Sequence, residues 1–473
     1  SLARLQVLGG VFDAVYIQAN GDVGLITADE YRNSTLSGTA LELFPNAIVV
    51  DGNLGEFRVN GSTSSTETLL GTVKDITIDV VGDLTLFSAG EGFRISLDVD
   101  GTINDFQVNR LSSTNITAGE LVGMNATDSI ICSTIAISGP INSITATDSI
   151  INTSISVTGP RGRLDLVTAA NLISGSISSA GPVGTISTSA GDIRAQITTI
   201  TQFGTIALLS AARDLDITTN ISAGVTSMVA GRHIGNQAKP GVILVKGHLG
   251  SATAGGSLYS DIRVGQTISG AVAIGAVTAK AGNNLVGNGS IIAFGRINSV
   301  TSAGDFGGNI ISWSGGIGSV SITNGSFYQG RKVAAYDGSI DSMVVTGGHL
   351  LGDVHADWDI TSLRVVASAD GVFGDVGINP ALSAFRSYDA RRNELPPGTA
   401  ASTHAPAPYG TTDTRSSRRR SRVQRSAGPA SCGSKSQMSL PAAYSTRGSM
   451  GSSSGSVIIG AMAMFPPSLA AVA

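Results

Sequence analysis

The sequence contains few of the residues on which disulfide-rich, helical and aromatic-core proteins depend. Of 473 residues, two are cysteine, 5% are aromatic and 14% are charged, and the helix formers Glu and Lys are scarce. Two cysteines provide neither a disulfide framework nor a Cys-x-x-Cys metal motif. The shortage of helix formers argues against long helices. The shortage of aromatic residues predicts that any core is aliphatic.

Positive charge is also scarce over most of the chain. Residues 1–385 contain 19 Lys and Arg against 31 Asp and Glu, a balance of −12, whereas residues 386–473 contain 11 against 3, a balance of +8. Because nucleic-acid binding requires clustered Lys and Arg to neutralise phosphate, the acidic region argues against nucleic acid as a partner. No run predicts a transmembrane segment, since the best candidate, residues 457–473, is short and is broken by Pro466-Pro467.

The sequence is instead rich in glycine, with 61 residues, and in a repeated pattern. The segment Ala126–Ile131 returns unchanged, twenty residues later, as Ala146–Ile151. A repeat of this length is too small to bury its own apolar face, so neighbouring units must stack to share one core. The many Ile, Val and Thr residues favour strands, and Gly, Asn and Asp favour tight turns.

Each repeat contains a first element with the pattern apolar-x-x-apolar-x-apolar, as in Ile317–Ile322 and Ile340–Val345. Steps of about 30 residues after positions 23, 73 and 242 predict inserted loops. The first apolar residue of the element is expected at positions 23, 54, 73, 103, 121, 141, 161, 183, 203, 225, 242, 274, 297, 317, 340 and 360, although Arg161 breaks the pattern.

A second element follows, in which a Gly-Asp corner precedes alternating apolar residues, as in Asp192–Ile197 and Asp305–Ile310. His233 and His349 occupy the corner position that Asp or Asn usually fills, which predicts that both are turn residues. Cys132 occupies the position of Asn152 in the next copy, so we expect a turn residue with a free thiol there.

These two elements predict an all-β fold, a right-handed parallel β-helix of about 20 residues per turn that occupies residues 1–380. Leucine-rich repeats share the period but need a Leu ladder and a helical back wall, and calcium-binding β-rolls need Gly-Gly-x-Gly-x-Asp runs. Neither pattern is present. The right hand follows from the strong preference of parallel crossovers.

Between Gly21 and Ala369 the chain resembles the Gly/Ser/Thr-rich β-solenoid repeats of bacterial secreted and cell-surface proteins, through units such as Gly316–Val320 and Gly338–Met343. These include planctomycete-type surface repeats and autotransporter or haemagglutinin-like adhesins. The resemblance implies a non-catalytic scaffold at an extracellular or cell-surface location. Its partners would be glycans, cell-wall or matrix polymers, or other copies of the chain. No catalytic residue is transferred, because a fold does not determine a function.

The repeat pattern ends near Pro380, and residues 381–473 are basic and rich in Pro, Ser and Arg. Such a composition cannot bury enough apolar surface to offset ordering, which predicts a disordered tail. One interpretation is a basic anchor for an acidic wall polymer or a membrane surface. The abrupt change of composition is equally explained by a mispredicted or out-of-frame end.

An alternative function is a carbohydrate-active β-helix enzyme, either a polysaccharide lyase or a hydrolase. Such enzymes use grouped carboxylates as acid and base. Strand alternation predicts that Val354, Ala356 and Trp358 share one face of their segment. The opposite face would carry a candidate acid–base or divalent-cation site, unless its charges only prevent pairing at a strand edge. The candidate residues are Asp353, His355, Asp357 and Asp359.

Calcium is a further candidate ligand, because several acidic residues fall at predicted turns. If the turns align, their carboxylates would form a vertical ladder that binds Ca²⁺. Asx-turn capping explains each residue equally well. The candidates are Asp83, Asp128, Asp148, Asp192, Asp214 and Asp305.

Overall fold

The computed structural model describes residues 1–7, 11–13, 15–32, 47–61, 71–265, 272–280, 289–366, 376–378, 388–390 and 393–394. The chain divides into two units, Ser1–Arg420 and Ser421–Ala473, and all the described residues belong to the first. They form strands and turns and no helix. Apart from two short strands, the predicted tail lies outside the described residues.

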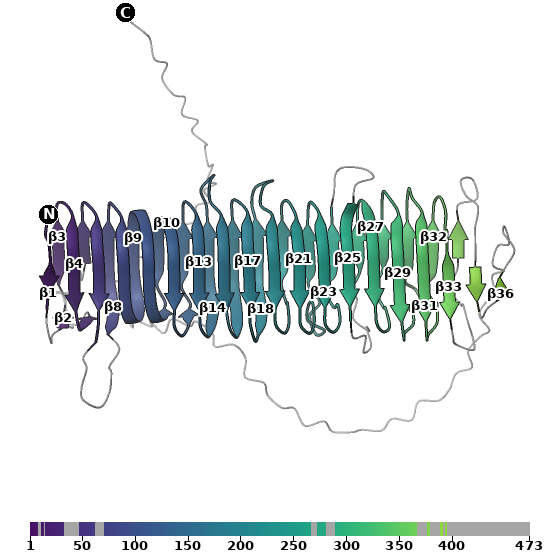
Figure 1. Cartoon of the computed structure of the whole chain (residues 1–473), viewed down its shortest axis with the longest axis horizontal. Coiled ribbons are helices and arrows are strands. Elements are labelled where there is room, and N and C mark those ends of the chain that lie inside the picture. The colour runs from purple at the N-terminus through teal and green to yellow at the C-terminus, as the bar shows by residue number, and fades with distance from the viewer. Residues whose placement is uncertain are drawn as a thin grey trace, which may run out of the picture. The chain divides into compact units, whose positions relative to one another are not determined.

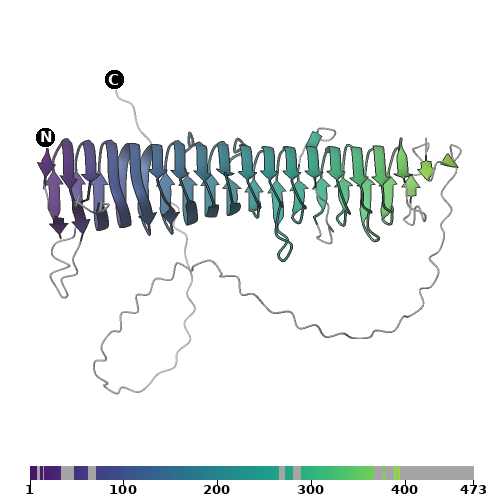
Figure 2. The same cartoon turned by 60° about the horizontal axis from the view of Figure 1, so that its bottom comes forward.

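The strands wind into a parallel β-solenoid of about 15 turns with about 21 residues per turn, so the predicted fold class is confirmed. Figures 1 and 2 show the turns stacked side by side along one axis. All described strand pairs are parallel except β35–β36, which is antiparallel. Each turn contributes to three rows of stacked strands, named A, B and C in chain order.

Row A contains the apolar-x-x-apolar-x-apolar element, and its pairing reaches β35, beyond the boundary predicted at residue 380. Its strands are β1 (Leu5–Gln6), β4 (Val23–Ala28), β7 (Leu54–Val59), parts of β9 (Leu84–Ser112) and β10 (Asn115–Ala126), β13 (Ile141–Ala146), β15 (Leu164–Ala169), β17 (Val183–Thr188), β19 (Ile206–Ala211), β21 (Val225–Ala230), β23 (Leu249–Ala254), β25 (Val272–Ala279), β27 (Arg296–Ser302), β29 (Ile317–Thr323), β31 (Ile340–Thr346), β33 (Leu363–Val366) and β35 (Tyr388–Ala390), which pairs with β36 (Asn393–Glu394).

Row C contains the end of the second element. Besides further parts of β9 and β10, its strands are β3 (Tyr16–Ala19), β6 (Ala47–Val50), β8 (Thr72–Val80), β12 (Thr134–Ile137), β14 (Ser149–Val157), β16 (Leu172–Ser179), β18 (Asp192–Thr199), β20 (Thr218–Ile221), β22 (Val242–Val245), β24 (Asp261–Val264), β26 (Ile291–Ala293), β28 (Ile310–Ser312), β30 (Lys332–Ala335), β32 (Asp353–Ala356) and β34 (Val376–Ile378).

Row B is the shortest row and lies between the other two in each turn. It consists of β2 (Val11–Asp13), β5 (Glu30–Arg32), β11 (Ile130–Ile131), two short parts of β9, and the first residues of β8, β14, β16 and β18. In later turns it is reduced to single bridges, which involve Leu215, Ile234, Leu258, Phe306, Phe327 and Leu350.

One continuous core of buried apolar residues runs from Val23 to Val365. In β13, for example, Ile141, Ile144 and Ala146 are buried and the residues between them face outward. The core is aliphatic over most of its length, as predicted. Its early turns differ, because three buried phenylalanines stack in row A with ring centroids 5.2 and 4.4 Å apart: Phe57, Phe87 and Phe106.

Most of the predicted row A positions are confirmed, as in the register Ile297, Ile317 and Ile340. Four are wrong: Val73 pairs with Gly92 in row B, Val242 pairs with Asp261 in row C, and Arg161 and Phe203 lie in corners. The residues that take their places are Leu84, Leu164, Ile206 and Leu249.

The predicted inserted loops have different outcomes. The loop expected after position 73 is wrong, because β8 pairs directly with β9 of the next turn. The loops expected after positions 23 and 242 coincide with residues 33–46 and 266–271, which lie outside the described residues.

The corner between rows B and C is formed in five successive turns by one residue with a positive φ. This φ lies between 48° and 54° in all five residues, and it is 51° at both Arg94 and Cys132. Cys132 and Asn152 therefore occupy equivalent corner positions, as predicted. The free thiol predicted at Cys132 is wrong, because Cys132 is disulfide-bonded. The five residues are Asp75, Arg94, Ser113, Cys132 and Asn152.

Candidate functional site

The first candidate site is the acidic segment around β32. Val354 and Ala356 are buried, and Asp353 and His355 face outward and are half-buried, so the predicted alternation is confirmed within the strand. It is wrong for Trp358, whose side chain is 49% exposed. The strand ends at Ala356 and the chain then turns, so residues beyond it no longer alternate between the core and the surface.

The structure brings two of the four candidates into contact. The Nε2 atom of His355 lies 2.9 Å from Oδ1 of Asp357, and Oδ2 of Asp357 accepts a hydrogen bond of 3.0 Å from the backbone N–H of Asp337. The Asp337 hydrogen bond is the main cause that lowers the pKa of Asp357, and His355 lowers it further. A general acid needs a raised pKa. This arrangement favours an ionised carboxylate that orients His355.

The other two candidates lie on either side of this pair. Asp353 is on β32, and Asp359 lies after the corner, where its backbone carbonyl accepts the N–H of Ile340. Among the described residues, no group of three or more His, Cys, Asp or Glu is placed to hold a metal ion. The described side chains therefore present a His–Asp pair rather than an assembled cation site.

Aromatic side chains border this pair, and the sequence patterns above did not identify them. The rings of Trp313 and Tyr336 stack at 4.8 Å, and Tyr336 lies 5.6 Å from the ring of His355. Trp313 is 51% exposed, and Phe294 in the preceding turn is 44% exposed. Their position in the repeat could have identified them, because Phe294, Trp313 and Tyr336 each directly follow the last residue of a row C strand.

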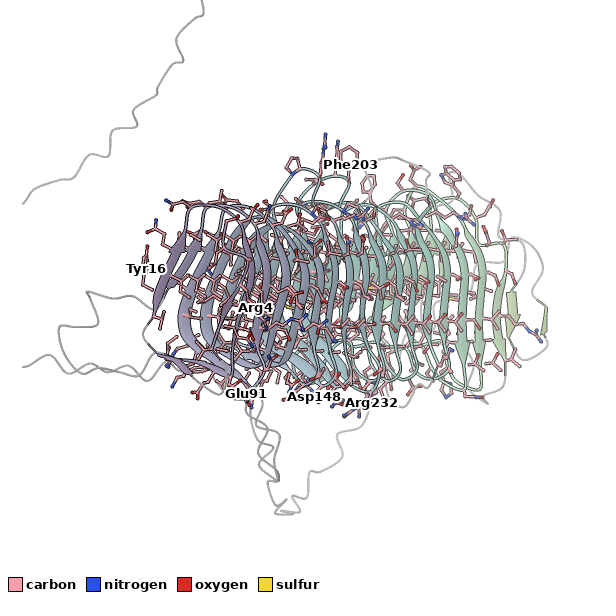
Figure 3. The ribbon with its side chains drawn as sticks, turned by 60° about the vertical axis from the view of Figure 1, so that its left-hand side comes forward. Arg4, Tyr16, Glu91, Asp148, Phe203 and Arg232 are labelled. Atoms are coloured by element: carbon pink, nitrogen blue, oxygen red, sulfur yellow. The ribbon has the colours of Figure 1, made fainter. Side chains whose placement is uncertain are left out.

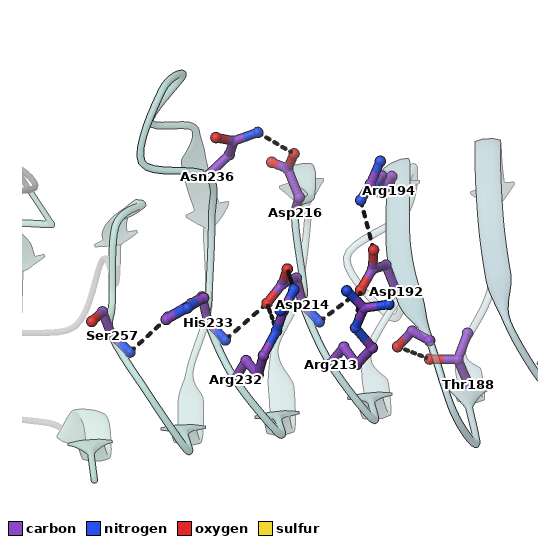
Figure 4. A network of polar contacts seen from close by, with 11 residues as sticks. Thr188, Asp192, Arg194, Arg213, Asp214, Asp216, Arg232, His233, Asn236 and Ser257 are labelled. Atoms are coloured by element: carbon purple, nitrogen blue, oxygen red, sulfur yellow. Dashed lines mark hydrogen bonds and ion pairs between the residues drawn. The ribbon is translucent and has the colours of Figure 1, made fainter. Parts of the chain in front are cut away.

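The second candidate site is the set of turn aspartates, and one group of these forms a row along the corner between rows A and B (Figure 4). The carboxylate of Asp192 accepts the N–H of Asp214 at 3.1 Å, and that of Asp214 accepts the N–H of His233 at 3.2 Å. The Nδ1 atom of His233 then accepts the N–H of Ser257 at 3.0 Å. His233 is therefore a turn residue, as predicted, whose ring nitrogen takes the place of a carboxylate oxygen.

The same row contains the second predicted turn histidine. Oδ1 of Asp305 accepts the N–H of Ser326 at 2.7 Å, and Oγ of Ser326 accepts the N–H of His349 at 2.9 Å. Oδ2 of Asp305 also accepts the hydroxyl of Tyr328 at 2.8 Å, and this hydrogen bond raises the pKa of Tyr328. His349 occupies the corner position of Asp305, two turns later, as predicted.

Asp128, Asp148 and Asp83 also bind neighbouring turns. Ser129 donates to Asp128 at 3.2 Å and to Asp148 at 3.1 Å. Oδ1 of Asp83 accepts the N–H of Thr102 at 2.7 Å. Each carboxylate thus satisfies a polar group of its own or an adjacent corner, which is the capping role weighed above. Calcium binding by these residues stays a prediction.

Comparison with known protein families, curated proteins and solved structures yields no match to this chain. The resemblance to bacterial surface repeats therefore stays a prediction. None of the described residues belongs to a helix that is long and apolar enough to cross a membrane.

Proposed function

We propose that the chain is a non-catalytic scaffold of the extracellular space or cell surface. In this role the solenoid is a stiff rod, and its polar outer faces bind glycans, wall or matrix polymers, or other copies of the chain. The observation that carries the proposal is that the polar side chains at the candidate sites are engaged in hydrogen bonds within the solenoid. Most of them bind the next turn of the same coil, as the row Asp192, Asp214 and His233 does.

The outer faces also support this proposal. Short hydroxyl side chains follow one another up the stack, and Ser154 bonds to Ser176, and Ser156 to Ser178, at 3.1 Å. A surface of short hydroxyls costs little conformational entropy when it binds a partner. The continuous core gives the rod its stability, since each turn stacks only on its two neighbours.

A carbohydrate-active enzyme is the competing proposal, and the His355–Asp357 pair beside exposed aromatic residues is the observation in its favour. An enzyme of this kind would act through carboxylates that face one another across a groove, about 5 to 9.5 Å apart in glycoside hydrolases. The lowered pKa of Asp357 suits an ion pair better than a proton donor.

The two proposals are separated by incubating the full chain with insoluble polysaccharides, including cellulose, chitin, peptidoglycan and pectin. We expect the protein to sediment with at least one polymer without releasing soluble reducing ends or unsaturated products. Product release that is lost in His355→Ala and Asp357→Asn, with unchanged melting temperatures, would establish the enzyme. Failure to bind any polymer, together with a monomeric state in solution, would also contradict the scaffold.

A further inference from the structure

A cleft crosses the solenoid at the corner between rows C and A. One wall is the corner loop 200–205, between β18 and β19, and the other is the corner Lys246-Gly247-His248, between β22 and β23. The floor is the corner of the turn between them, Ser222-Ala223-Gly224. The cleft has a volume of about 470 Å³.

Hydrogen bonds hold the loop that forms the first wall. The hydroxyl of Thr201 donates to the carbonyl of Ala180 in the preceding turn, and the N–H of Gly204 donates to the carbonyl of Thr201 at 2.9 Å. The hydroxyl of Ser222 on the floor donates to the carbonyl of Thr199 at 2.7 Å. The cleft is therefore formed before any ligand arrives, which lowers the entropy cost of binding.

The lining of the cleft is cationic and hydroxylated. Lys246 and His248 are exposed, and no ion pair joins either of them to another described residue. No carboxylate belongs to the described lining, whose other polar side chains are Gln202, Thr205, Ser222 and Thr226. Amide and hydroxyl groups of this kind exchange hydrogen bonds with hydroxyls of a ligand.

The cleft carries positive charge on a solenoid that is acidic overall, as Arg161 does in an earlier turn of the same corner. The same corner carries Asp83 in an early turn and Asp337 and Asp357 in late turns, and residues 1–385 have a net charge of −12. An anion is therefore repelled along much of this edge and attracted at the cleft. Charge complementarity selects an anionic ligand for this position.

The loop of the first wall also carries two exposed apolar side chains next to the residues that line the cleft. Phe203, at the tip of the first wall, is 70% exposed, and Ile200 in the same loop is 60% exposed. Figure 3 shows Phe203 projecting from the edge of the solenoid opposite Asp148 and Arg232. A sugar ring has hydroxyls at its edge and apolar C–H groups on its faces, so it can contact the ring of Phe203 while its hydroxyls bind the polar lining.

We propose that this cleft binds an acidic oligosaccharide. The anionic group binds Lys246 and His248, the sugar hydroxyls bind the Gln, Ser and Thr side chains, and one sugar face lies against Phe203. This inference rests on the scaffold function proposed above and specifies one of its ligands, a glycan that contains uronic acid.

The test is isothermal titration of the full chain with trigalacturonic acid, its trimethyl ester and tripolyphosphate. We expect the acid to bind at least about tenfold more tightly than the ester, because a hydrogen bond to a charged group is stronger than one to a neutral group. The double variant Lys246→Ala with His248→Ala loses this difference. Phe203→Ala weakens binding of the acid by about threefold, as loss of one aromatic contact predicts.

The matched control is Arg161→Gln, because Arg161 is an exposed cation of the same corner that lies outside the cleft. We expect its affinity to equal that of the unaltered chain. Equal affinity for the acid and the ester, equal affinity for tripolyphosphate, or full binding by the double variant would overturn the proposal. Sedimentation with insoluble polymers that survives in the double variant would leave the scaffold function standing without this site.

Discussion

The early and the late turns of the solenoid close the same corner by different means. Between rows B and C, the turns that contain Ser113 and Asn152 bend through one residue with a positive φ. In later turns, Oδ1 of Asp261 accepts the N–H of Ser290 at 2.9 Å, and Oγ of Ser290 accepts the N–H of Asn309 at 3.1 Å. The early corners turn on one left-handed residue other than glycine, and these two late corners are stabilised by side-chain acceptors. In a third late turn the left-handed residue is a glycine, Gly330, with a φ of 72°.

Strand length follows from this difference. A single left-handed residue lets the chain resume its pairing at once, and β9 extends over 29 residues and contributes to all three rows. In the late turns β26 and β28 have three residues each. The comparison shows that a constant period does not require a constant corner, because only the stacking of successive turns must be preserved.

The largest expected effect concerns the core of the early turns, where three phenylalanines stack in row A. Phe87→Ala removes the middle ring of the stack and should cost about 3–5 kcal/mol. We expect faster hydrogen–deuterium exchange in β7 and β9 and little change in β29, because each turn contacts only its neighbours. Leu209→Ala, in the aliphatic core, is the control, and a larger loss there would contradict the importance of the ring stack.

The same substitution at the two kinds of corner should have opposite effects. Ser113→Gly should stabilise the protein by about 0.5–1 kcal/mol, because Ser113 is exposed with a φ of 53° and glycine adopts this conformation without strain. Ser290→Gly should destabilise it by about 1 kcal/mol, because the N–H of Asn309 loses its acceptor. Thermal unfolding of both variants measures the signs, and equal signs would show that the corners do not differ.

The smallest effects depend on pH and concern one aspartate from each region. The pKa of Asp79 is raised above its ordinary 3.8, mainly by burial and further by the negative charges of Asp98, Asp100 and Asp51. The contribution of Asp79 to the free energy of unfolding is therefore complete below pH 3.8, and it is lost as the pH rises through the folded-state pKa. Asp79→Asn should raise the melting temperature at pH 7, where it increases the free energy of unfolding by less than about 1 kcal/mol. At pH 3 the melting temperature should change little.

Asp357 should behave in the opposite sense, because its pKa is lowered below 3.8. Its contribution is present above pH 3.8 and is lost as the pH falls through the folded-state pKa. Asp357→Asn should therefore lower the melting temperature at pH 7, again by less than about 1 kcal/mol, and the difference should shrink toward pH 2. A pH-independent difference for either variant would mean that it acts through packing.

The period and the parallel stacking were predictable because every turn must bury apolar residues at the same place. The row of a given residue was harder to predict. Val73, Ile76 and Ile78 fit the row A pattern, yet Val73 belongs to row B and Ile78 to row C, with the left-handed Asp75 between them. The spacing of apolar residues predicts which of them are buried. It does not predict whether a corner separates them, and so it does not assign them to a row.

The candidate site was predictable in part for the same reason. Asp353 and His355 face outward because strand alternation holds as far as Ala356. The contact between His355 and Asp357, and the exposure of Trp358, depend on the corner that follows. The cleft is formed by three corners from different turns. The sequence could not place these corners next to one another, because the register of the rows was not known.

The corner row of Asp192, Asp214, His233 and Ser257 has a consequence for how such a chain can lengthen. The side chain of each of its first three residues accepts a backbone N–H from the turn that follows. Within this row, a turn therefore donates an N–H to the preceding turn and accepts one from the next. A duplicated turn would therefore find both its donor and its acceptor for this row in the neighbouring turns. Ala126–Ile131 and its copy Ala146–Ile151 have the form that such a duplication leaves behind. The length of the rod is thus open to evolution in steps of one turn.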